Sequence, residues 1–431
     1  MSSDTRFWHP FADMAAVRGH EILITRGEGV YVWDAAGTRY LDGTASLWCV
    51  NVGHGRTEIV EAVAAQMREL AGYSAFGAFT NRPAETLAER LAGYADGLVD
   101  DPRIFFGLGG GDAIDTAAKL ARRYFAAIGQ PDRVHLIGRS QGYHGTHGLG
   151  TSIGGIPANQ AGMGPLDPDT SHVPWDSLEA LEAEFERVGP ERVAAVFAEP
   201  VIGAGGVHRV PPGYLQGLAA LCERYGALFV ADAVIGAFGR LGTWFAADRF
   251  GLRPDMIAFA KGVTSGYLPL GGVVVSGRVA QPFFEEDGLW FRHGQTYSGH
   301  ATCCAAAHAN LDIIEREGLL ERGRELEDEI TAAMRPLEGG ALVGEVRVGI
   351  GALAAVAFDP DALAEHPDLP ARTFAAAKER GVLVRPLGDA VAISPPLTIT
   401  REQVGQAAEG IGEAVAAVAA GLGRAPSAAG A

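Results

Sequence analysis

The sequence predicts an α/β protein in which a large domain, built on a mostly parallel β-sheet flanked by helices, is joined to a smaller α+β domain. Helical patterns and short apolar runs alternate through the middle of the chain, which is typical of strands buried between two layers of helices. The chain has 431 residues, more than one small hydrophobic core organises. With 48% hydrophobic and 20% charged residues, its composition is that of a globular protein.

The composition also excludes several classes of function. A net charge of -17 repels nucleic acid and anionic membranes, so neither is an expected partner. The four cysteines form no C-x-x-C pair, which argues against a disulfide framework or a zinc site, and free thiols are typical of the cytoplasm. The N-terminus lacks the features of a signal peptide, and no apolar run reaches about 18 residues. We therefore expect a cytoplasmic protein without a membrane span.

The N-terminal part of the chain is predicted to contain short strands. These are expected at residues 21–25, 30–34 and 39–42, with turns at 26–29 and 35–37 where glycines occur. The chain is divided into residues 1–55, an N-terminal segment that contributes to the small domain, 56–317, the large domain, 318–424, a C-terminal small domain, and 425–431, a small polar tail expected to be disordered.

The large domain is predicted from two alternating patterns. Helical periodicity occurs at residues 58–70, 84–94, 113–127, 177–188 and 212–225. Apolar runs of strand length occur at residues 103–106, 134–137, 194–198, 228–231, 256–260 and 272–275. A long alanine-rich helix is expected over residues 301–317, and a turn at 385–389 between two strands of the small domain.

The first candidate site is the glycine-rich stretch from Gly107 to Asp112, between an apolar run and a helix. In open α/β sheets, ligands gather at the carboxyl ends of the strands. Glycines let backbone N–H groups approach an anion, and a helix N-terminus adds partial positive charge, so this stretch suits a phosphate. It matches neither a Walker loop nor a good dinucleotide fingerprint, and the alternative interpretation is a tight strand-to-helix turn.

Two charged residues end further apolar runs. Asp232 follows residues 228–231 and is either a helix cap or an acid that keeps a cationic ring nitrogen protonated. Lys261 follows residues 256–260, where desolvation lowers the pKa of an amine and makes it nucleophilic, as a Schiff-base lysine requires. The alternative for Lys261 is a side chain that leaves the sheet for solvent.

An aromatic residue follows the run at 134–137. Tyr143 is placed to stack on a flat heterocycle, although packing within the loop is the alternative. His144 and His147 come next, but no carboxylate or cysteine nearby in the sequence completes a ligand set, so no metal is expected.

Together these signals describe one site. It has a phosphate cradle, a stacking aromatic ring, an acid for a ring nitrogen and a lysine for an aldehyde, which are the four things that pyridoxal 5'-phosphate requires. We therefore predict a pyridoxal-phosphate enzyme whose catalytic residues are Lys261 and Asp232.

Three stretches of the chain resemble the class III aminotransferases. They are DAVIGAFGRLG (residues 232–242), PDMIAFAKGVTSGYLPLGG (254–272) and HGQTYSGH (293–300). The resemblance extends from about Trp8 to about Val415, and the lysine and Thr-Tyr-Ser-Gly-His motifs are its most specific parts. It implies the fold type I of pyridoxal-phosphate-dependent transferases, and a homodimer or a tetramer with active sites at the subunit interface.

The resemblance also implies a role for each site residue. Lys261 would hold the cofactor covalently and move the proton, and Asp232 would pair with the pyridine nitrogen. The other implied cofactor contacts are Gly110 and Gly111 at the phosphate, Tyr143 and Val234 on the two ring faces, Thr296 of the neighbouring subunit at the phosphate, and Glu199 near the site.

Within the family, residues 47–55 and 385–397 are similar to omega-transaminases that use amines with pyruvate. There Trp48 and Tyr143 would line the substrate pocket. Arg385 would pair with a substrate carboxylate and swing away for an apolar amine, a role that suits the planar, permanently charged guanidinium. The implied reaction is a ping-pong transfer of an amino group from a primary amine or omega-amino acid to a keto acid such as pyruvate.

Several alternatives remain open. Trp8-His9-Pro10-Phe11 is similar to the N-terminus of the adenosylmethionine-8-amino-7-oxononanoate aminotransferase of biotin synthesis. A racemase or decarboxylase on the same fold would differ by its independence of a keto acid. A nicotinamide dehydrogenase would use the glycine stretch but leave Lys261 unexplained, and a non-catalytic cofactor-binding homologue is the last alternative.

The chain departs from the family pattern at several positions. Gly109 and Gly111 stand where serines are usual, Ala233 where a glutamate usually follows the aspartate, and Gly236 where a hydroxyl or other small residue is common. The loss of one hydroxyl removes a phosphate hydrogen bond worth roughly 0.5–1.5 kcal/mol. These departures concern cofactor affinity more than chemistry.

Overall fold

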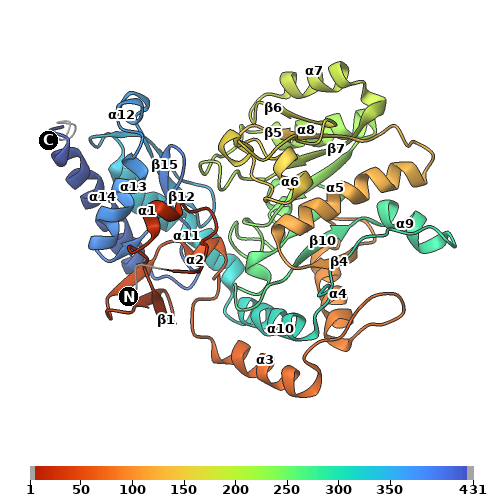
Figure 1. The fold of residues 1–431 in the computed structure, drawn as a ribbon, viewed down its shortest axis with the longest axis horizontal. Coiled ribbons are helices and arrows are strands. Elements are labelled where there is room, and N and C mark those ends of the chain that lie inside the picture. Colours follow the sequence, from red (N-terminus) through yellow and green to blue (C-terminus); the bar gives the residue numbers. More distant parts are fainter. Residues whose placement is uncertain (1–4, 425–431) are drawn as a thin grey trace.

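A seven-stranded sheet forms the centre of the larger lobe (Figure 1). The computed structural model describes residues 5–424. The strands are β4 (Arg103–Gly107), β5 (His135–Arg139), β6 (Thr170–Val173), β7 (Val193–Ala198), β8 (Leu228–Asp232), β9 (Met256–Phe259) and β10 (Gly271–Val275). Their spatial order is β4-β10-β9-β8-β7-β5-β6, and β10 alone runs antiparallel to its neighbours. The predicted mostly parallel sheet is therefore confirmed.

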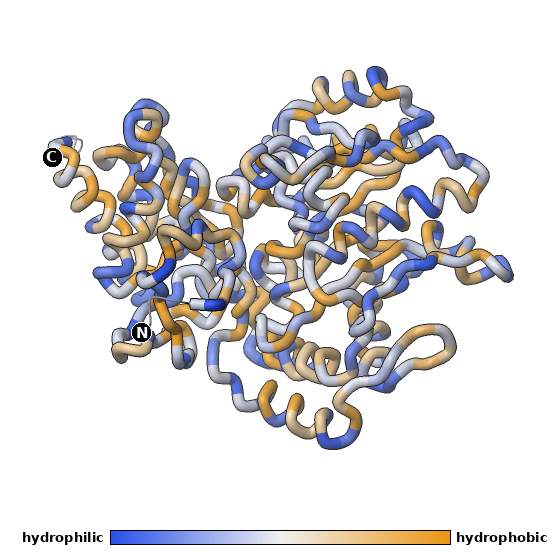
Figure 2. The backbone as a smooth tube through the Cα atoms, viewed as in Figure 1, coloured by the Kyte–Doolittle hydropathy of each residue, from blue (hydrophilic) through white to orange (hydrophobic). Residues whose placement is uncertain are grey.

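Both faces of this sheet are covered, which explains the apolar runs in the sequence. Along β8, Leu228 and Val230 pack in a hydrophobic cluster with α5 (Gly110–Ala127). Phe229 and Ala231 belong to the cluster on the opposite face, where α8 (Tyr214–Tyr225) lies. Successive side chains of a strand alternate between faces, so a strand buried on both sides is apolar at every position. Figure 2 shows hydrophobic residues along these central strands.

A layer of helices lies below the sheet in Figure 1. There α10 (Ala301–Arg316) packs against α3 (Thr57–Leu70) and α4 (Arg82–Ala95). The other helices of this lobe are α6 (Gly148–Ile153), α7 (Leu178–Val188) and α9 (Gly277–Glu285). A membrane-spanning helix, of sufficient length and apolarity, is not found between residues 5 and 424.

The smaller lobe joins the first part of the described chain to the last. One sheet has the order β1-β2-β3-β13 and the other β11-β12-β15-β14. The strands are β1 (Ile24–Glu28), β2 (Tyr31–Asp34), β3 (Arg39–Asp42), β11 (Val343–Arg347), β12 (Ala354–Phe358), β13 (Val382–Leu383), β14 (Arg385–Pro386) and β15 (Ala390–Ile393). The helices are α1 (Met14–Val17), α2 (Ala45–Trp48), α11 (Leu319–Met334), α12 (Pro360–Glu365), α13 (Leu369–Glu379) and α14 (Arg401–Gly421).

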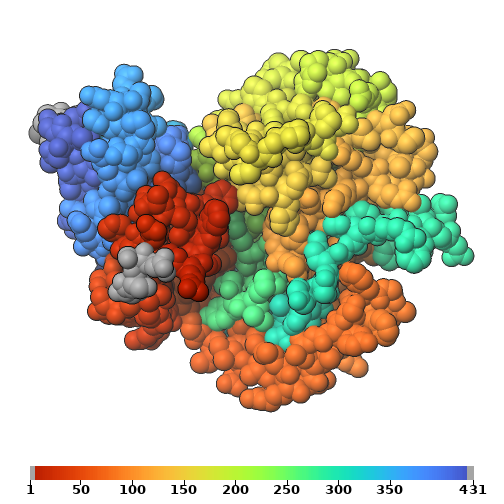
Figure 3. All heavy atoms as spheres, in the orientation of Figure 1, coloured from red at the N-terminus to blue at the C-terminus, as the bar shows by residue number. Residues whose placement is uncertain are grey.

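The parallel pairing of β3 with β13 places the N-terminal segment against the C-terminal part of the chain. Figure 3 shows this segment, in red, between the blue C-terminal part and the larger lobe. The seven-stranded sheet takes all its strands from residues 56–317, and the two small sheets take theirs from either side of that range. The domain boundaries themselves stay a prediction, and the tail at 425–431 lies outside the described residues.

A buried arginine connects the two lobes. Arg240 follows β8 and is fully buried. Its guanidinium donates to the carbonyl oxygens of Ala352 (3.1 Å) and Pro395 (2.6 Å) and to the side-chain oxygen of Asn51 (2.7 Å). Because burial removes water from this cation, it lowers the pKa of Arg240 to about 10. These hydrogen bonds connect segments that are far apart in sequence, and they fix the position of one lobe relative to the other.

Three details of the predicted elements are wrong or incomplete. The first strand lies at Ile24–Glu28 and not at 21–25. Residues 26–28, which were predicted to belong to a turn, continue the pairing with β2 as far as Glu28 opposite Tyr31. Strand β6 is missing from the prediction, since its sequence, Thr-Ser-His-Val, has no apolar run. Finally, Arg385 and Pro386 pair with β15, so the predicted turn is confined to residues 387–389.

Candidate active site

The predicted site residues meet at the carboxyl end of the large sheet. A cavity of about 250 Å³ lies there, and its wall includes Lys261, Asp232, Glu199 and Tyr143. These residues stand at or just after the ends of β9, β8, β7 and β5. Parallel strands end at one edge of a sheet, so residues separated by more than 100 positions share one space.

Lys261 stands immediately beyond β9 in a left-handed conformation, with φ +48°. This backbone region is uncommon for a residue with a side chain and marks a position that the surrounding structure fixes. The amine makes no hydrogen bond or ion pair with any of residues 5–424. Burial lowers the pKa of Lys261, and the negative charge of Asp232 opposes that shift only in part. A larger fraction of the amine is therefore neutral and nucleophilic near neutral pH.

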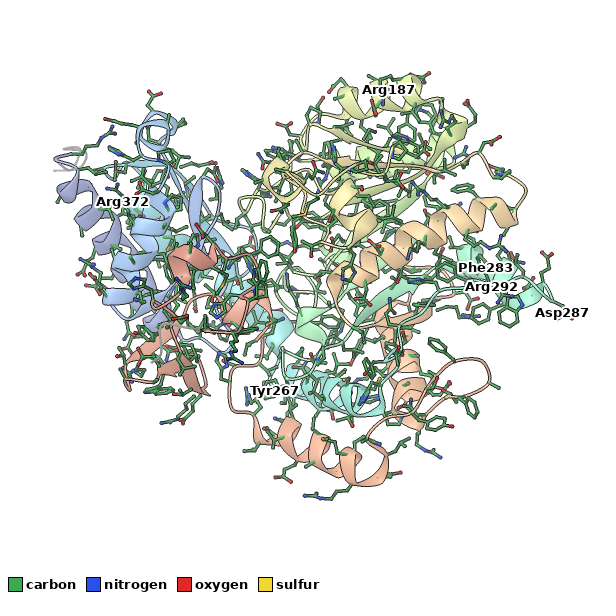
Figure 4. The ribbon with its side chains drawn as sticks, in the orientation of Figure 1. Arg187, Tyr267, Phe283, Asp287, Arg292 and Arg372 are labelled. Carbon is green, nitrogen blue, oxygen red and sulfur yellow. The ribbon has the colours of Figure 1, made fainter. Side chains whose placement is uncertain are left out.

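The loop that follows Lys261 is held to the N-terminal segment by Tyr267, labelled in Figure 4. The Tyr267 hydroxyl donates to the carbonyl oxygen of Gly53 (2.9 Å) and accepts the backbone N–H of Arg56 (2.7 Å). The loop that positions Lys261 is thus tied to a segment more than 200 residues away in sequence.

We expect the cofactor-free Lys261→Met variant to be more stable than the cofactor-free wild type at pH 7, by about 1 kcal/mol or more, because a buried amine without a partner is removed. The folded pKa of Lys261 lies below the unfolded value of 10.5. The free-energy cost of burying the amine is therefore absent above pH 10.5, and it grows as the pH falls from 10.5 toward the folded pKa of Lys261. The difference in the free energy of unfolding between the variant and the wild type should decrease as the pH is raised toward 10. Urea unfolding at pH 7 and pH 10 measures it, and a wild type that is the more stable protein at pH 7 would contradict this account.

Asp232 is held by His144, a contact that the sequence did not reveal. The His144 Nδ1 atom lies 2.8 Å from Oδ2 of Asp232, and both side chains are buried. The other oxygen of Asp232 accepts the backbone N–H of Val234 at 3.1 Å. These two contacts fix the plane of the carboxylate, and an ionised Asp232 favours the His144 tautomer with its proton on Nδ1.

A second buried carboxylate lies beside this pair. Glu199 accepts the backbone N–H groups of Tyr143 (3.0 Å) and Gly203 (2.9 Å). Burial raises the pKa of Glu199, and the nearby charge of Asp232 raises it further. Glu199 thereby anchors the loop that carries Tyr143 to the end of β7.

The predicted phosphate cradle is the first turn of α5. Gly110 and Gly111 open this helix, so their N–H groups have no partner within it. Asp112 accepts the N–H groups of Leu108 and Gly109, each at 2.7 Å, and closes the preceding loop. A Cβ atom on Gly110 would lie 2.7 Å from Cγ1 of Val234, so only glycine fits there. The free backbone N–H groups can donate hydrogen bonds to an anion.

Aromatic residues border the cavity on the side of the N-terminal segment. Phe11 contacts Tyr143 edge-on, with 6.3 Å between the ring centroids. The Trp8–Phe11 stretch, whose resemblance to another aminotransferase is described above, therefore ends next to the site. Burial raises the pKa of Tyr143.

Three predicted residues lie outside the cavity wall. Trp48 is 3% exposed and belongs to the hydrophobic core, and its neighbour Leu47 lines the cavity. Arg385 stands on β14 in the smaller lobe, where it is close enough to affect the pKa values of Tyr143 and Lys261. Thr296 lies in the segment before α10 and does not line the cavity of its own chain.

The residues present fit pyridoxal phosphate. A free amine, a fixed carboxylate and a helix N-terminus surround one cavity, and the glycine at 110 leaves room beside Val234. When bound, this cofactor supplies an aldehyde that condenses with amines and a ring that takes up an electron pair. Lys261 and Asp232 both line this cavity.

Comparisons with known proteins point to one family. Residues 14–415 match the protein family described as Aminotransferase class-III. The putrescine–pyruvate aminotransferase of Pseudomonas aeruginosa is 37% identical over 406 residues, which cover 89% of this chain and 88% of that protein. A probable aminotransferase of Mycobacterium tuberculosis is 42% identical over 359 residues, covering 79% and 76%.

Solved structures give the same result for the fold. An amine transaminase from an uncultivated Pseudomonas species, in a PLP-bound form, has a TM-score of 0.91 at 37% identity and covers 96% of this chain and 99% of its own. An (S)-enantioselective omega-transaminase from Thermomicrobium roseum has a TM-score of 0.91 at 39% identity, covering 95% and 96%.

Proposed function

Because the chain belongs to the class-III aminotransferases, fold type I enzymes that use pyridoxal phosphate, we propose that it transfers an amino group from a primary amine or an omega-amino acid to a keto acid such as pyruvate. The observation that carries this proposal is the shared cavity of Lys261, Asp232 and the first turn of α5. The amine and omega-transaminases among the structural neighbours, and the putrescine–pyruvate relative, favour an amine donor and a pyruvate acceptor.

The proposed reaction assigns a task to each residue. The amine of Lys261 would hold the cofactor, and the same amine would remove the proton from the substrate carbon and return it. The carboxylate of Asp232, fixed by His144, keeps the ring nitrogen protonated. A carbonyl product leaves before the keto acid enters, so the kinetics are ping-pong.

Arg385 is proposed to bind the substrate carboxylate. It makes no ion pair with any of residues 5–424, because the nearby Asp389 is paired with Arg347 (2.6 Å). Burial lowers the pKa of Arg385. A half-buried guanidinium without a partner carboxylate is suited to a carboxylate ligand, which it can bind through two parallel hydrogen bonds. Trp48 stays a predicted contributor to the substrate pocket next to Leu47.

The Arg385→Ala variant is expected to lose roughly 10- to 100-fold in kcat/KM for keto acids and amino acids, as expected when a buried charge pair is broken. The amine half-reaction with a simple apolar amine should change by less than about threefold, since no carboxylate is present. Single-turnover rates for each half-reaction measure the two effects separately. Arg372→Ala, on the surface of α13 (Figure 4), is the matched control. Equal losses in both half-reactions would remove the assigned role.

We also propose a homodimer with active sites at the interface, and a cytoplasmic location because the four cysteines are free thiols. Phe76, Phe79 and Trp290 are exposed around a groove of about 1140 Å³ on the larger lobe. The arm that bears Phe283, Asp287 and Arg292 extends from this lobe (Figure 4). We propose that a second copy buries these rings. The family resemblance implies that Thr296 then contacts the phosphate bound by the other protomer.

Analytical ultracentrifugation is expected to show a dimer, or a tetramer made of two dimers. A Thr296→Ala variant should remain a dimer and bind the cofactor about 3- to 10-fold more weakly, because one hydrogen bond to a charged group is lost. A monomer with full activity would contradict this arrangement.

A panel of amines with pyruvate tests the proposed reaction. Purified protein should absorb near roughly 400–430 nm, as lysine-bound pyridoxal phosphate does, and the band should bleach when an amine donor is added. Alanine should then form from pyruvate in proportion to the amine consumed. Turnover without any keto acid would point to a racemase or decarboxylase, and strict dependence on adenosylmethionine and 8-amino-7-oxononanoate to the biotin-pathway reaction.

A further inference from the structure

The phosphate end of the cavity has few side chains that can bind an anion. Its helix turn contributes Gly110 and Gly111, which have no side-chain donors, and the hydroxyl groups in the cavity wall are those of Tyr143 and Thr146. Lys261 is the one lysine or arginine in the wall, and its amine is used for the covalent attachment. Asp232 and Glu199 are carboxylates and repel a phosphate. A phosphate dianion therefore needs a further donor from a neighbouring element.

His147 stands next to this turn. A Cβ atom built on Gly111 would lie 3.6 Å from Nδ1 of His147, with the Cε1 and Cγ atoms of the ring at 3.7 Å. The imidazole thus occupies the space beside Gly111 where a hydroxyl side chain would project. His147 also lines the cavity, and its side chain makes no hydrogen bond or ion pair with any of residues 5–424.

The backbone around His147 is fixed against α5. Gly145 has φ +87°, and a Cβ atom on it would lie 2.6 Å from Cα of Gly111, so only glycine permits this approach. On the other side of His147, the backbone N–H of Gly150 donates to Asp115 of α5 at 2.8 Å. Two anchors therefore hold a free imidazole at the mouth of the phosphate cradle.

We propose that His147 binds the phosphate group of the cofactor and replaces the hydroxyl groups that the glycine turn lacks. This inference rests on the proposed function and adds a binding residue to its site. An imidazole N–H donates a hydrogen bond to a phosphate oxygen. Phosphate binding here combines backbone N–H groups of α5 and a side chain from the loop after β5 with Thr296 of the neighbouring subunit, as proposed above.

The test compares two ligands that differ only in the phosphate. The full chain, freed of cofactor, is titrated with pyridoxal phosphate and with pyridoxal, and binding is followed by absorbance. The His147→Ala variant should bind pyridoxal phosphate roughly tenfold more weakly and pyridoxal with unchanged affinity, since a hydrogen bond to a charged group is lost. The control is His20→Ala, an exposed histidine of the N-terminal segment, which should match the wild type.

Two results would overturn the proposal. One is an unchanged affinity of His147→Ala for pyridoxal phosphate, and the other is an equal loss for both ligands, which indicates damage to the loop. A wild type that binds neither ligand would instead reject the proposed function itself, so the two failures are distinguishable.

Rescue gives a second, independent measurement. Outside its own helix, the nearest contact of a Cβ atom at position 111 is the His147 ring at 3.6 Å, and this ring is absent from His147→Ala, so Gly111→Ser should fold normally in that variant. Added to His147→Ala, it should restore the affinity for pyridoxal phosphate to within roughly threefold of the wild type, since one phosphate hydrogen bond replaces another. A double variant as weak as His147→Ala would contradict the placement of the phosphate beside Gly111 and His147.

Discussion

Replacing Lys261 with alanine is expected to lower kcat for transamination by about 10³- to 10⁴-fold, because one group supplies both the covalent attachment and the proton transfer. The amine lies in the cavity without a hydrogen bond or ion pair to residues 5–424, so its loss should leave the fold intact. Steady-state rates with an amine and pyruvate measure the effect. The absorption band near roughly 400–430 nm should be absent from the variant.

Because the chain contains few lysines, the lysine that holds the cofactor can be identified directly. The sequence contains three, at positions 119, 261 and 378. Reduction of the cofactor-loaded protein with borohydride, followed by peptide mapping, should label Lys261 alone. Lys378→Ala, on α13 of the smaller lobe, is the control and should keep full activity. A label on Lys119 or Lys378, or a Lys261→Ala variant with more than a tenth of the activity, would reject the assigned anchor.

The Asp232→Asn variant is expected to lower kcat by about 10²- to 10³-fold, the range found when one preorganised electrostatic contact at the reacting group is removed. An asparagine keeps the shape and can still accept a hydrogen bond from His144, but it cannot hold the ring nitrogen protonated. The variant should therefore still bind the cofactor while turning over slowly. Absorbance titration and steady-state kinetics separate the two properties.

The matched control is a carboxylate at the other end of the same sheet. Asp255 precedes β9, accepts the N–H of Phe229 at 2.9 Å, and pairs with Arg278. Asp255→Asn should reduce stability and leave kcat within about twofold of the wild type, because it lies far from the reacting atoms. Comparable losses of kcat in both variants would mean that Asp232 acts through the fold and not on the cofactor.

Much of the fold follows from local patterns in the sequence. The runs ending at Ala198, Ala231 and Phe259 are apolar at every position because both faces of those strands are buried. Parallel strands end at one edge, so the residues just beyond them had to converge. The ends of the strands were harder to predict. Strand β1 extends through Gly27, in a stretch whose sequence resembles a turn, because pairing with β2 outweighs the preference of glycine for turns.

The sequence by itself determined which residues meet in one cavity, because a lysine, an aspartate and a glycine turn at the ends of parallel strands lie at one edge of the sheet. The tertiary structure alone decided which side chains support them. His144 contacts Asp232, which is 88 positions away in sequence, and Phe11 contacts Tyr143. Leu47 lines the cavity beside the buried Trp48. Arg347 forms an ion pair with Asp389, so Asp389 does not pair with Arg385. Strand-end positions are fixed by periodicity and sheet topology, whereas contacts between loops depend on how segments distant in sequence pack, which no local pattern records.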